Sequence, residues 1–217
     1  MKRIIYIIIL FSAICVNAFS QTNKKFNESE KQVFEQKLVD HSKQIKTLQC
    51  AFTQEKTSTL MSEKAVAKGI LLYQSPDMLR WEYISPTQST LILNGNNAAL
   101  LDKNGKPLGN ERMLKQIGGI IISMISGDGL GQNKQFSSEI FNAGNNEIRV
   151  VLTPVQKRMK DFYSKIELKI DAKTLLANEI VLNENSGDKT VILLTNKELN
   201  KEIPIDKFAI KSVLSSQ

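Results

Sequence analysis

Short segments of alternating apolar and polar residues, separated by turn signals, make up most of the chain from Leu48 onward. The segments are Leu48–Glu55, Ala65–Gln74, Met78–Ile84, Thr87–Leu93, Ala98–Asp102, Ile148–Pro154, Asp161–Asp171, Ala177–Asn183, Lys189–Leu194 and a weak last one near Phe208. The turn signals are Asn94-Gly95, Asn104-Gly105, Gly144-Asn145 and Gly187-Asp188. Side chains that alternate between two faces belong to strands, and strands joined by such short turns have to run antiparallel. The pattern predicts a mainly β (α+β) fold built on a long antiparallel sheet.

The segment Asp161–Asp171 shows the alternation most clearly. One face carries Phe162, Ser164, Ile166, Leu168 and Ile170, and the other carries Tyr163, Lys165, Glu167 and Lys169. A strand with one wet face is typical of a sheet that is covered on one side only. We therefore expect all helical segments to lie on the same face of the sheet.

The residues before the first strand have a helical period. Asn27 and Glu30 are spaced as a capping box, and the predicted helix runs from Asn27 to Thr47. Its apolar stripe consists of Phe34, Leu38, His41, Ile45 and Leu48. A single stripe of this kind lies against one partner surface. We expect this helix to cover the concave face of the sheet.

A second helical stretch interrupts the strands between Glu111 and Phe141. Its apolar residues with helical spacing are Met113, Leu114, Ile117, Ile120, Ile121, Met124 and Ile125. A further short helical piece is expected over Lys134–Phe141. The stretch is too apolar to lie free in solvent and too short to span a membrane. Its expected place is the hollow of a strongly curved sheet, beside the first helix.

Residues 1–20 read as a secretory signal peptide. Two basic residues precede the apolar run Ile4–Ile14, and small residues allow cleavage before Phe19 or Gln21. The run is too short and wrongly flanked for a stable membrane span. We expect residues 21–217 to form a single domain outside the cytoplasm.

The cysteines predict neither a lipid anchor nor a disulfide. Cys15 follows Ile14, which is a poor fit where the acylation signal of a lipoprotein needs a small residue. Cleavage of the signal then leaves Cys50 as the only cysteine. One cysteine cannot form an intramolecular disulfide, so the stability has to come from an ordinary core.

The formal net charge of +7 is compatible with nucleic acid, an anionic membrane surface or simple solubility. The only dense basic cluster is Lys157-Arg158-Lys160, and no aromatic-rich motif accompanies it. Nucleic-acid binding is therefore not expected. His41 is the only histidine, so a zinc site would need carboxylates for every other ligand. We predict no metal site and no cofactor.

The motifs of common enzyme classes do not assemble in this sequence. There is no Gly-x-Ser-x-Gly and no His-Glu-x-x-His. The glycines of Gly127-Asp128-Gly129-Leu130-Gly131 follow a predicted helix rather than a strand, so they do not make a dinucleotide fingerprint. Asp102-Lys103-Asn104-Gly105 begins like a calcium loop, but its glycine comes too early, and a hairpin turn is expected. We predict no enzyme, although two carboxylates that meet in space stay open as a glycosidase pair.

Large apolar side chains share one face of the segment Met78–Tyr83. Leu79, Trp81 and Tyr83 alternate with Arg80 and Glu82. One interpretation is an ordinary core, and the other is an elongated apolar hollow that accommodates an acyl chain. Burial of about sixteen methylenes contributes roughly 12 kcal/mol at about 0.8 kcal/mol each. Such a site needs no set of convergent polar groups.

Several motifs, in this order and spacing, resemble the LolA family, the periplasmic carriers of outer-membrane lipoproteins. They are Leu48-Gln49-Cys50-Ala51-Phe52-Thr53-Gln54, Gly69-Ile70-Leu71-Leu72-Tyr73-Gln74-Ser75-Pro76, Leu79-Arg80-Trp81-Glu82-Tyr83, Leu91-Ile92-Leu93-Asn94-Gly95, and Ile203-Pro204 to Phe208. Together they cover nearly the whole mature chain. The resemblance implies an unclosed antiparallel half-barrel with a helical lid and an N-terminal helix that covers the concave face.

The resemblance also implies a function and partners. The expected function is that of a periplasmic chaperone that binds lipoprotein acyl chains and carries them from the inner to the outer membrane. The expected partners of this monomeric carrier are acylated lipoproteins, an inner-membrane ABC transporter of the lipoprotein-release type, and an outer-membrane acceptor. The alternatives are a lipid-binding sensor or adaptor, and a carrier of another amphiphile such as a glycolipid or pigment precursor.

By position, the resemblance implies a lipid-binding cavity. Its expected lining is Leu79, Trp81, Tyr83, Ile117, Ile120, Ile121, Met124 and Ile125. The expected lid hinges are Gly118, Gly119, Gly127 and Gly129, since glycine adopts more backbone conformations than any other residue.

One position departs from the family pattern. Ser75 stands directly before Pro76, where well-studied members have an arginine whose contacts hold the lid closed. Arg80 alternates to the other face and cannot be assumed to replace it. We therefore expect the lid, residues 111–131, to close through apolar packing and to be more open or more mobile than in relatives with the arginine.

Overall fold

The computed structural model describes residues 23–60, 63–109, 118, 121–122 and 136–210. The predicted signal peptide, residues 1–20, therefore lies outside the described residues. Among those that are described, no helix has the length and apolar character needed to cross a membrane.

The first helix, α1 (Glu28–Ser42), begins where the sequence predicts. The Asn27 side chain accepts a hydrogen bond of 2.9 Å from Glu30 N, and the Glu30 side chain accepts one of 2.8 Å from Asn27 N. The capping box is therefore confirmed. The predicted C-terminal end is wrong, because the helix stops at Ser42 and Thr47 already belongs to the first long strand.

Most of the rest of the described chain consists of strands, some long and some short. They are β1 (Lys24–Lys25), β2 (Thr47–Thr57), β3 (Ala65–Gln74), β4 (Met78–Ser85), β5 (Ser89–Asn94), β6 (Asn97–Asp102), β7 (Pro107–Leu108), β8 (Phe136–Gly144), β9 (Glu147–Pro154), β10 (Tyr163–Asp171), β11 (Ala177–Glu184) and β12 (Lys189–Leu199). Two short helices complete the elements, α4 (Lys157–Lys160) and the 3₁₀ helix η1 (Ile205–Phe208).

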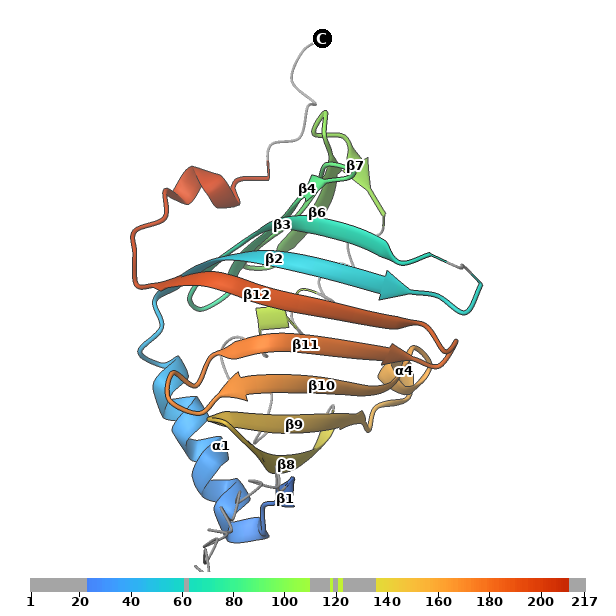
Figure 1. Ribbon diagram of the computed structural model, residues 1–217. Coiled ribbons are helices and arrows are strands. Elements are labelled where there is room, and N and C mark those ends of the chain that lie inside the picture. The colour runs from blue at the N-terminus through green and yellow to red at the C-terminus, as the bar shows by residue number, and fades with distance from the viewer. Residues whose placement is uncertain (1–22, 61–62, 110–117, 119–120, 123–135, 211–217) are drawn as a thin grey trace, which may run out of the picture.

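All strands described here form one antiparallel sheet in the order β1-β8-β9-β10-β11-β12-β2-β3-β4-β5-β6-β7. The edge strands β1 and β7 do not pair with each other, so the sheet is unclosed. Figure 1 shows β9–β12 face-on and β4, β6 and β7 turned almost edge-on at the top, so the sheet is strongly curved. The predicted unclosed antiparallel half-barrel is confirmed.

The predicted turns are also confirmed. Gly95 and Gly187, with φ of 58° and 88°, lie in the turns that join β5 to β6 and β11 to β12. In the turn between β6 and β7, Asp102 Oδ1 accepts hydrogen bonds from Asn104 N and Lys106 N, both at 2.8 Å. That segment is thus a hairpin turn, as the sequence indicates.

Two further sequence-based predictions are wrong. The segment Lys134–Phe141 was expected to be helical, but β8 begins at Phe136. Phe136 and Ile140, its buried residues at this end, are four apart, and that spacing fits both a helix and one face of a strand. The weak strand near Phe208 is η1, where Lys207 N donates to Pro204 O at 3.0 Å. The edge strands β1 and β7 were not predicted.

The strand β10 is shorter than the predicted Asp161–Asp171. Ile166, Leu168 and Ile170 are buried as expected, but Phe162 is 62% exposed. The pairing of β10 with β11 is irregular between Tyr163 and Lys165. The alternation therefore holds only from that irregularity onward.

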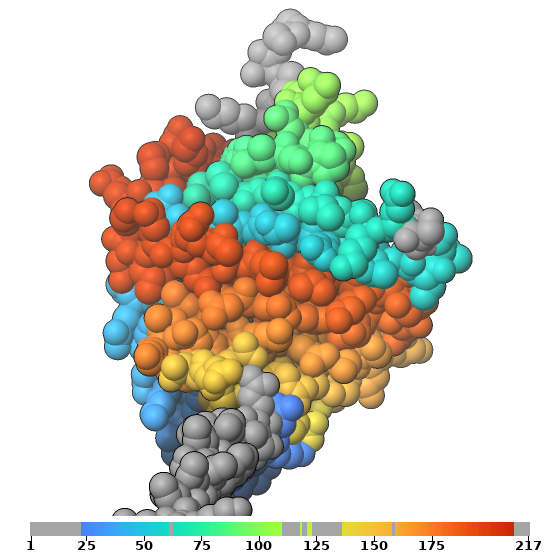
Figure 2. Space-filling view, viewed as in Figure 1, coloured from blue at the N-terminus to red at the C-terminus, as the bar shows by residue number. Residues whose placement is uncertain are grey.

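The main core lies on one face of the sheet, here called the inner face, which is the face that α1 covers. Phe34 and Leu38 of α1 belong to the same buried cluster as Leu79 and Leu168 of the sheet. In Figure 2 the opposite face forms continuous bands of side chains, and α1 is visible only along the left edge. A second, smaller cluster joins Leu72 to Ile203 and Phe208 on this outer face. The expectation of one covered face therefore holds except where the C-terminal segment packs.

Candidate functional site

The inner faces of β2–β5 form the apolar floor of the candidate site. Leu79 and Trp81 on β4 are 0% and 4% exposed, and Tyr83 is partly buried. Leu79 pairs with Tyr73 on β3 and Leu93 on β5. The predicted division of β4 into an apolar and a charged face is confirmed, because these residues belong to the main core while Arg80 and Glu82 form an ion pair on the other face.

Three aromatic rings form the centre of this floor. The ring centroids of Phe52 and Trp81 are 4.5 Å apart, and Phe52 meets Tyr83 edge-on at 5.2 Å. Gly69, which pairs with Phe52, leaves the space for this contact, because a Cβ there would lie 2.5 Å from the Phe52 ring. Sequence reasoning missed Phe52 as a site residue, although it shares its face of β2 with the buried Leu48 and Cys50.

The aromatic floor contains few polar atoms. The Tyr83 hydroxyl donates a hydrogen bond of 2.9 Å to Gln54 Oε1. Burial raises the pKa of Tyr83, and the neighbouring Trp81 and Gln54 side chains oppose part of that rise. Trp81 Nε1 is buried and lies near enough to the Tyr83 hydroxyl to influence its pKa, but it makes no well-formed hydrogen bond within the described part of the chain. A buried donor without an acceptor is costly and is available to a ligand atom that accepts a hydrogen bond.

Only part of the predicted lid falls on described residues. Residues 118, 121 and 122 are helical, and Ile121 and Ile122 pack against the main core. A Cβ at Gly118 would lie 2.1 Å from the Leu93 side chain. The helix therefore lies directly on the floor at this point. The other predicted lid residues lie outside the described residues: Ile117, Ile120, Met124, Ile125, Gly119, Gly127 and Gly129.

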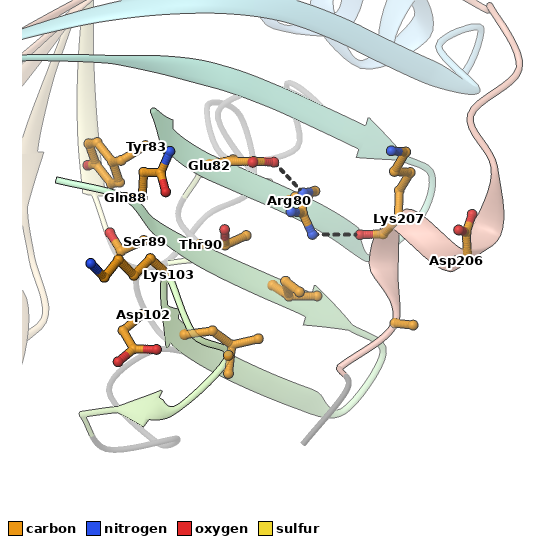
Figure 3. A pocket seen from close by; sticks show the side chains of 14 residues that line it. Arg80, Glu82, Tyr83, Gln88, Ser89, Thr90, Asp102, Lys103, Asp206 and Lys207 are labelled. Carbon is orange, nitrogen blue, oxygen red and sulfur yellow. Dashed lines mark hydrogen bonds and ion pairs between the residues drawn. The ribbon is translucent and has the colours of Figure 1, made fainter. Parts of the chain in front are cut away.

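The outer face of β4–β6 carries a different kind of hollow. It is a groove of about 510 Å³ with polar walls, bounded on one side by η1. Figure 3 shows Arg80 between Glu82 and Lys207; its Nε lies 2.7 Å from Glu82 Oε2, and its Nη1 donates to Lys207 O at 3.2 Å. Arg80 thus ties the C-terminal segment to the outer face of the sheet. The expectation that Arg80 points away from the inner face is confirmed.

Ser75 lies at the end of β3. Its backbone N–H donates a hydrogen bond of 2.8 Å to Lys46 O, which fixes the connection between α1 and β2. The prediction that the lid closes through apolar packing, without an arginine at this position, stays a prediction.

Side chains suited to metal or acid–base chemistry are dispersed. No group of three or more His, Cys, Asp or Glu residues within the described ranges is arranged to hold a metal ion. Burial raises the pKa of the Cys50 thiol to about 11, so this cysteine is protonated and a poor nucleophile at neutral pH. The site is built for apolar contact.

Comparison with known proteins finds one family whose sequence pattern covers most of this chain. The family model described as outer membrane lipoprotein carrier protein LolA matches residues 43–211. An outer-membrane lipoprotein carrier protein of Pseudomonas fluorescens (strain Pf0-1) is 22% identical over 163 residues, which are 75% of this chain and 77% of the relative.

Solved structures share the fold at low sequence identity. A crystal structure of MucB has a TM-score of 0.51 at 11% identity and covers 84% of this chain. The Pseudomonas aeruginosa MucA/MucB complex gives 0.50 at 11% identity over 82% of this chain. The alignments cover 63% and 60% of those chains, so this chain spans less than two thirds of their length. At this identity the likeness shows a common fold.

Proposed function

This chain belongs to the LolA family of outer membrane lipoprotein carrier proteins, and we propose that it binds lipoprotein acyl chains in its apolar interior and carries them from the inner to the outer membrane. The binding surface is the inner face of β2–β5, with Leu79, Trp81 and Tyr83 as its floor. The helical lid, to which Ile121 belongs, is its removable cover.

The observation that carries this proposal is the apolar contact that the described lid residues make with the floor. Ile121 and Ile122 pack on the main core while each keeps part of its surface exposed. An acyl chain offers the floor the same kind of apolar contact, at about 25 cal/mol per Å². Replacement of the lid by an acyl chain therefore costs little free energy. The floor stays shielded from water both in the empty protein and in the complex.

The poorly satisfied N–H of Trp81 supports an acylated cargo. Acyl esters carry a carbonyl oxygen, which accepts hydrogen bonds, next to the alkyl chain. Trp81 Nε1 is a buried donor without a well-formed hydrogen bond in the described chain. A cargo carbonyl at this position would satisfy it, and net hydrogen bonds of this kind contribute about 0.5–1.5 kcal/mol.

The cellular context follows from the same proposal. A cleaved signal peptide, residues 1–20, delivers residues 21–217 to the periplasm as one monomeric domain. The partners are acylated lipoproteins, an inner-membrane ABC transporter of the lipoprotein-release type and an outer-membrane acceptor. Neither an enzyme activity nor a cofactor is part of this function.

Native mass spectrometry of the protein purified from the periplasm tests the cargo. We expect a bound acylated species when the transporter and a lipoprotein substrate are supplied. Recovery of only glycolipids or other amphiphiles would favour the alternative carrier, and capture of a signalling protein without lipid would favour a sensor or adaptor. Absence of any acylated species under these conditions contradicts the proposal.

A pair of leucine variants tests the binding face. Leu79 and Leu72 lie on neighbouring strands and are both buried, but Leu79 faces inward and Leu72 belongs to the outer cluster. Leu79→Glu should abolish acyl binding by the folded molecules, while the control Leu72→Glu should retain it. The milder pair Leu79→Ala and Leu72→Ala serves if the glutamates prevent folding. Equal acyl binding by wild type and the Leu79 variants would exclude this face.

A further inference from the structure

A second apolar space lies on the inner face, between the C-terminal end of α1 and strands β10–β12. We call it the α1 crevice; its volume is about 30 Å³. Its walls are mainly leucine and isoleucine side chains, among them Leu38, Leu48, Ile180 and Leu194. These four residues belong to the same buried cluster as Trp81. The crevice is therefore a mouth of the apolar interior and not a separate surface hollow.

A lysine stands in this apolar wall because β12 is irregular. Ile192 and Leu194 face inward, and the pairing with β2 is then interrupted between Thr195 and Glu198. Asn196 has a φ of 51° at this bulge. A bulge re-aims the side chains that follow it, and Lys197 lines the crevice as a result.

Lys197 is partly buried in this wall and has no close acidic partner among the described residues. Its Nζ donates to the Asn178 side chain, and no carboxylate oxygen of the described residues lies within 4.0 Å of it. Burial lowers the pKa of Lys197, and the nearby Cys50 and Asp171 oppose this only in part. An ammonium group in an apolar wall is unfavourable unless a partner supplies negative charge.

The wall of the crevice also holds a strained residue. Leu175, in the turn between β10 and β11, has a φ of 56° and lines the crevice. A bulky side chain at positive φ is an outlier that its surroundings have to enforce. Here Leu175 N donates to Asp171 O at 2.8 Å, and Asp171 Oδ1 accepts hydrogen bonds from Lys173 N and Thr174 N. Such strain is typical of ligand-binding positions.

The only histidine in the chain completes the crevice. His41 lies in the last turn of α1 and lines the crevice together with Lys197. Its imidazole supplies an N–H donor whether or not it is charged. The crevice thus combines two nitrogen donors with mainly apolar walls, in which Ser42 is the other polar residue. This composition suits an anionic group on an alkyl chain.

We propose that the α1 crevice binds the anionic group of an amphiphile, a carboxylate or a phosphate, at Lys197, with the alkyl chain directed into the apolar interior. The crevice as it stands has room for little more than one water-sized group, so the chain has to enter between α1 and the sheet. This step rests on the proposed function, because the chain needs the same interior as a lipoprotein acyl chain. It extends the cargo to molecules with a negative headgroup.

Chain-matched ligands test the proposal. Oleate and dodecyl phosphate carry the charge, and monoolein and dodecanol lack it; acetate and inorganic phosphate carry the charge without the chain. We expect wild type to bind each charged amphiphile about tenfold or more tightly than its neutral counterpart, as expected for a hydrogen bond between charged groups. Calorimetry below the micellar concentration measures the affinities, and the free anions should not bind measurably.

Variants of Lys197 assign the preference to the crevice. Lys197→Met should reduce the charged-to-neutral ratio to near one while neutral binding persists, and Lys197→Arg should keep it. Lys201→Met is the matched control, because Lys201 is exposed and paired with Glu198 at 2.8 Å. A ratio near one in wild type, or an unchanged ratio in Lys197→Met, overturns the anion site. If wild type does not bind the neutral ligands monoolein and dodecanol at all, that result contradicts the proposed function instead. Failure of the anion site and failure of the proposed function are therefore distinguishable.

Discussion

The same strands, β3–β5, are covered on both faces, but the two covers are attached differently. On the outer face the C-terminal segment buries Phe208 and is fastened by hydrogen bonds from Arg80 to Lys207 O and from Asn94 to Phe208 O, at 3.2 and 3.3 Å. On the inner face the described lid residues Ile121 and Ile122 make apolar packing contacts. Directional hydrogen bonds specify one partner, whereas apolar contact accepts any apolar surface. These described contacts agree with our proposal of a permanent outer cover and an exchangeable inner one.

The largest expected effect comes from removal of one aromatic ring on each face. Trp81 and Phe208 are 4% and 0% exposed, so Trp81→Ala and Phe208→Ala should each lower the free energy of unfolding by about 3–5 kcal/mol. Urea unfolding measures this loss. Only Trp81→Ala should also weaken acyl binding by the folded molecules. Equal loss of binding in both variants would show that the two covers act as one unit.

The pH dependence of stability tests whether the inner face is dry. Burial raises the pKa of Cys50 from 9.0 to about 11. The thiol stays protonated in the folded protein while the unfolded chain ionises, so its contribution is complete below pH 9 and is lost as the pH rises toward 11. Wild type should lose roughly 2–3 kcal/mol more than Cys50→Ala over this range, at about 1.4 kcal/mol per pKa unit. Parallel stability curves for the two proteins would mean that water reaches Cys50.

The smallest expected effect concerns the fastening of the outer cover. Arg80→Met should lower the free energy of unfolding by about 1 kcal/mol, because the side chain is partly exposed and water screens its ion pair. Lys207→Ala is the control, since Arg80 binds the backbone carbonyl of Lys207 and not its side chain. Acyl affinity should stay unchanged in both variants. A reduced acyl affinity in Arg80→Met would break the distinction between the two faces.

The sequence by itself determined the features that depend on neighbouring residues. The capping box of Asn27 and Glu30, the hairpin turns at Gly95 and Gly187, and the inward face of Leu79 and Trp81 all follow from local hydrogen bonds and from alternation along one strand. The curved antiparallel sheet follows from the succession of such segments, and its unclosed half-barrel form is what the resemblance to the LolA family implies. These predictions needed no knowledge of which distant residues meet.

Only the tertiary structure decided the features that depend on distant partners. Phe136 and Ile140 fit a helix or a strand by spacing, and pairing with β9 selects the strand. Phe52 joins the floor because Gly69 on β3 leaves room for its ring. Lys197 reaches the inner face because the pairing of β12 with β2 is interrupted before it. In each case the energy comes from contacts across the sheet, and a linear sequence read without alignment does not reveal which strands those contacts join.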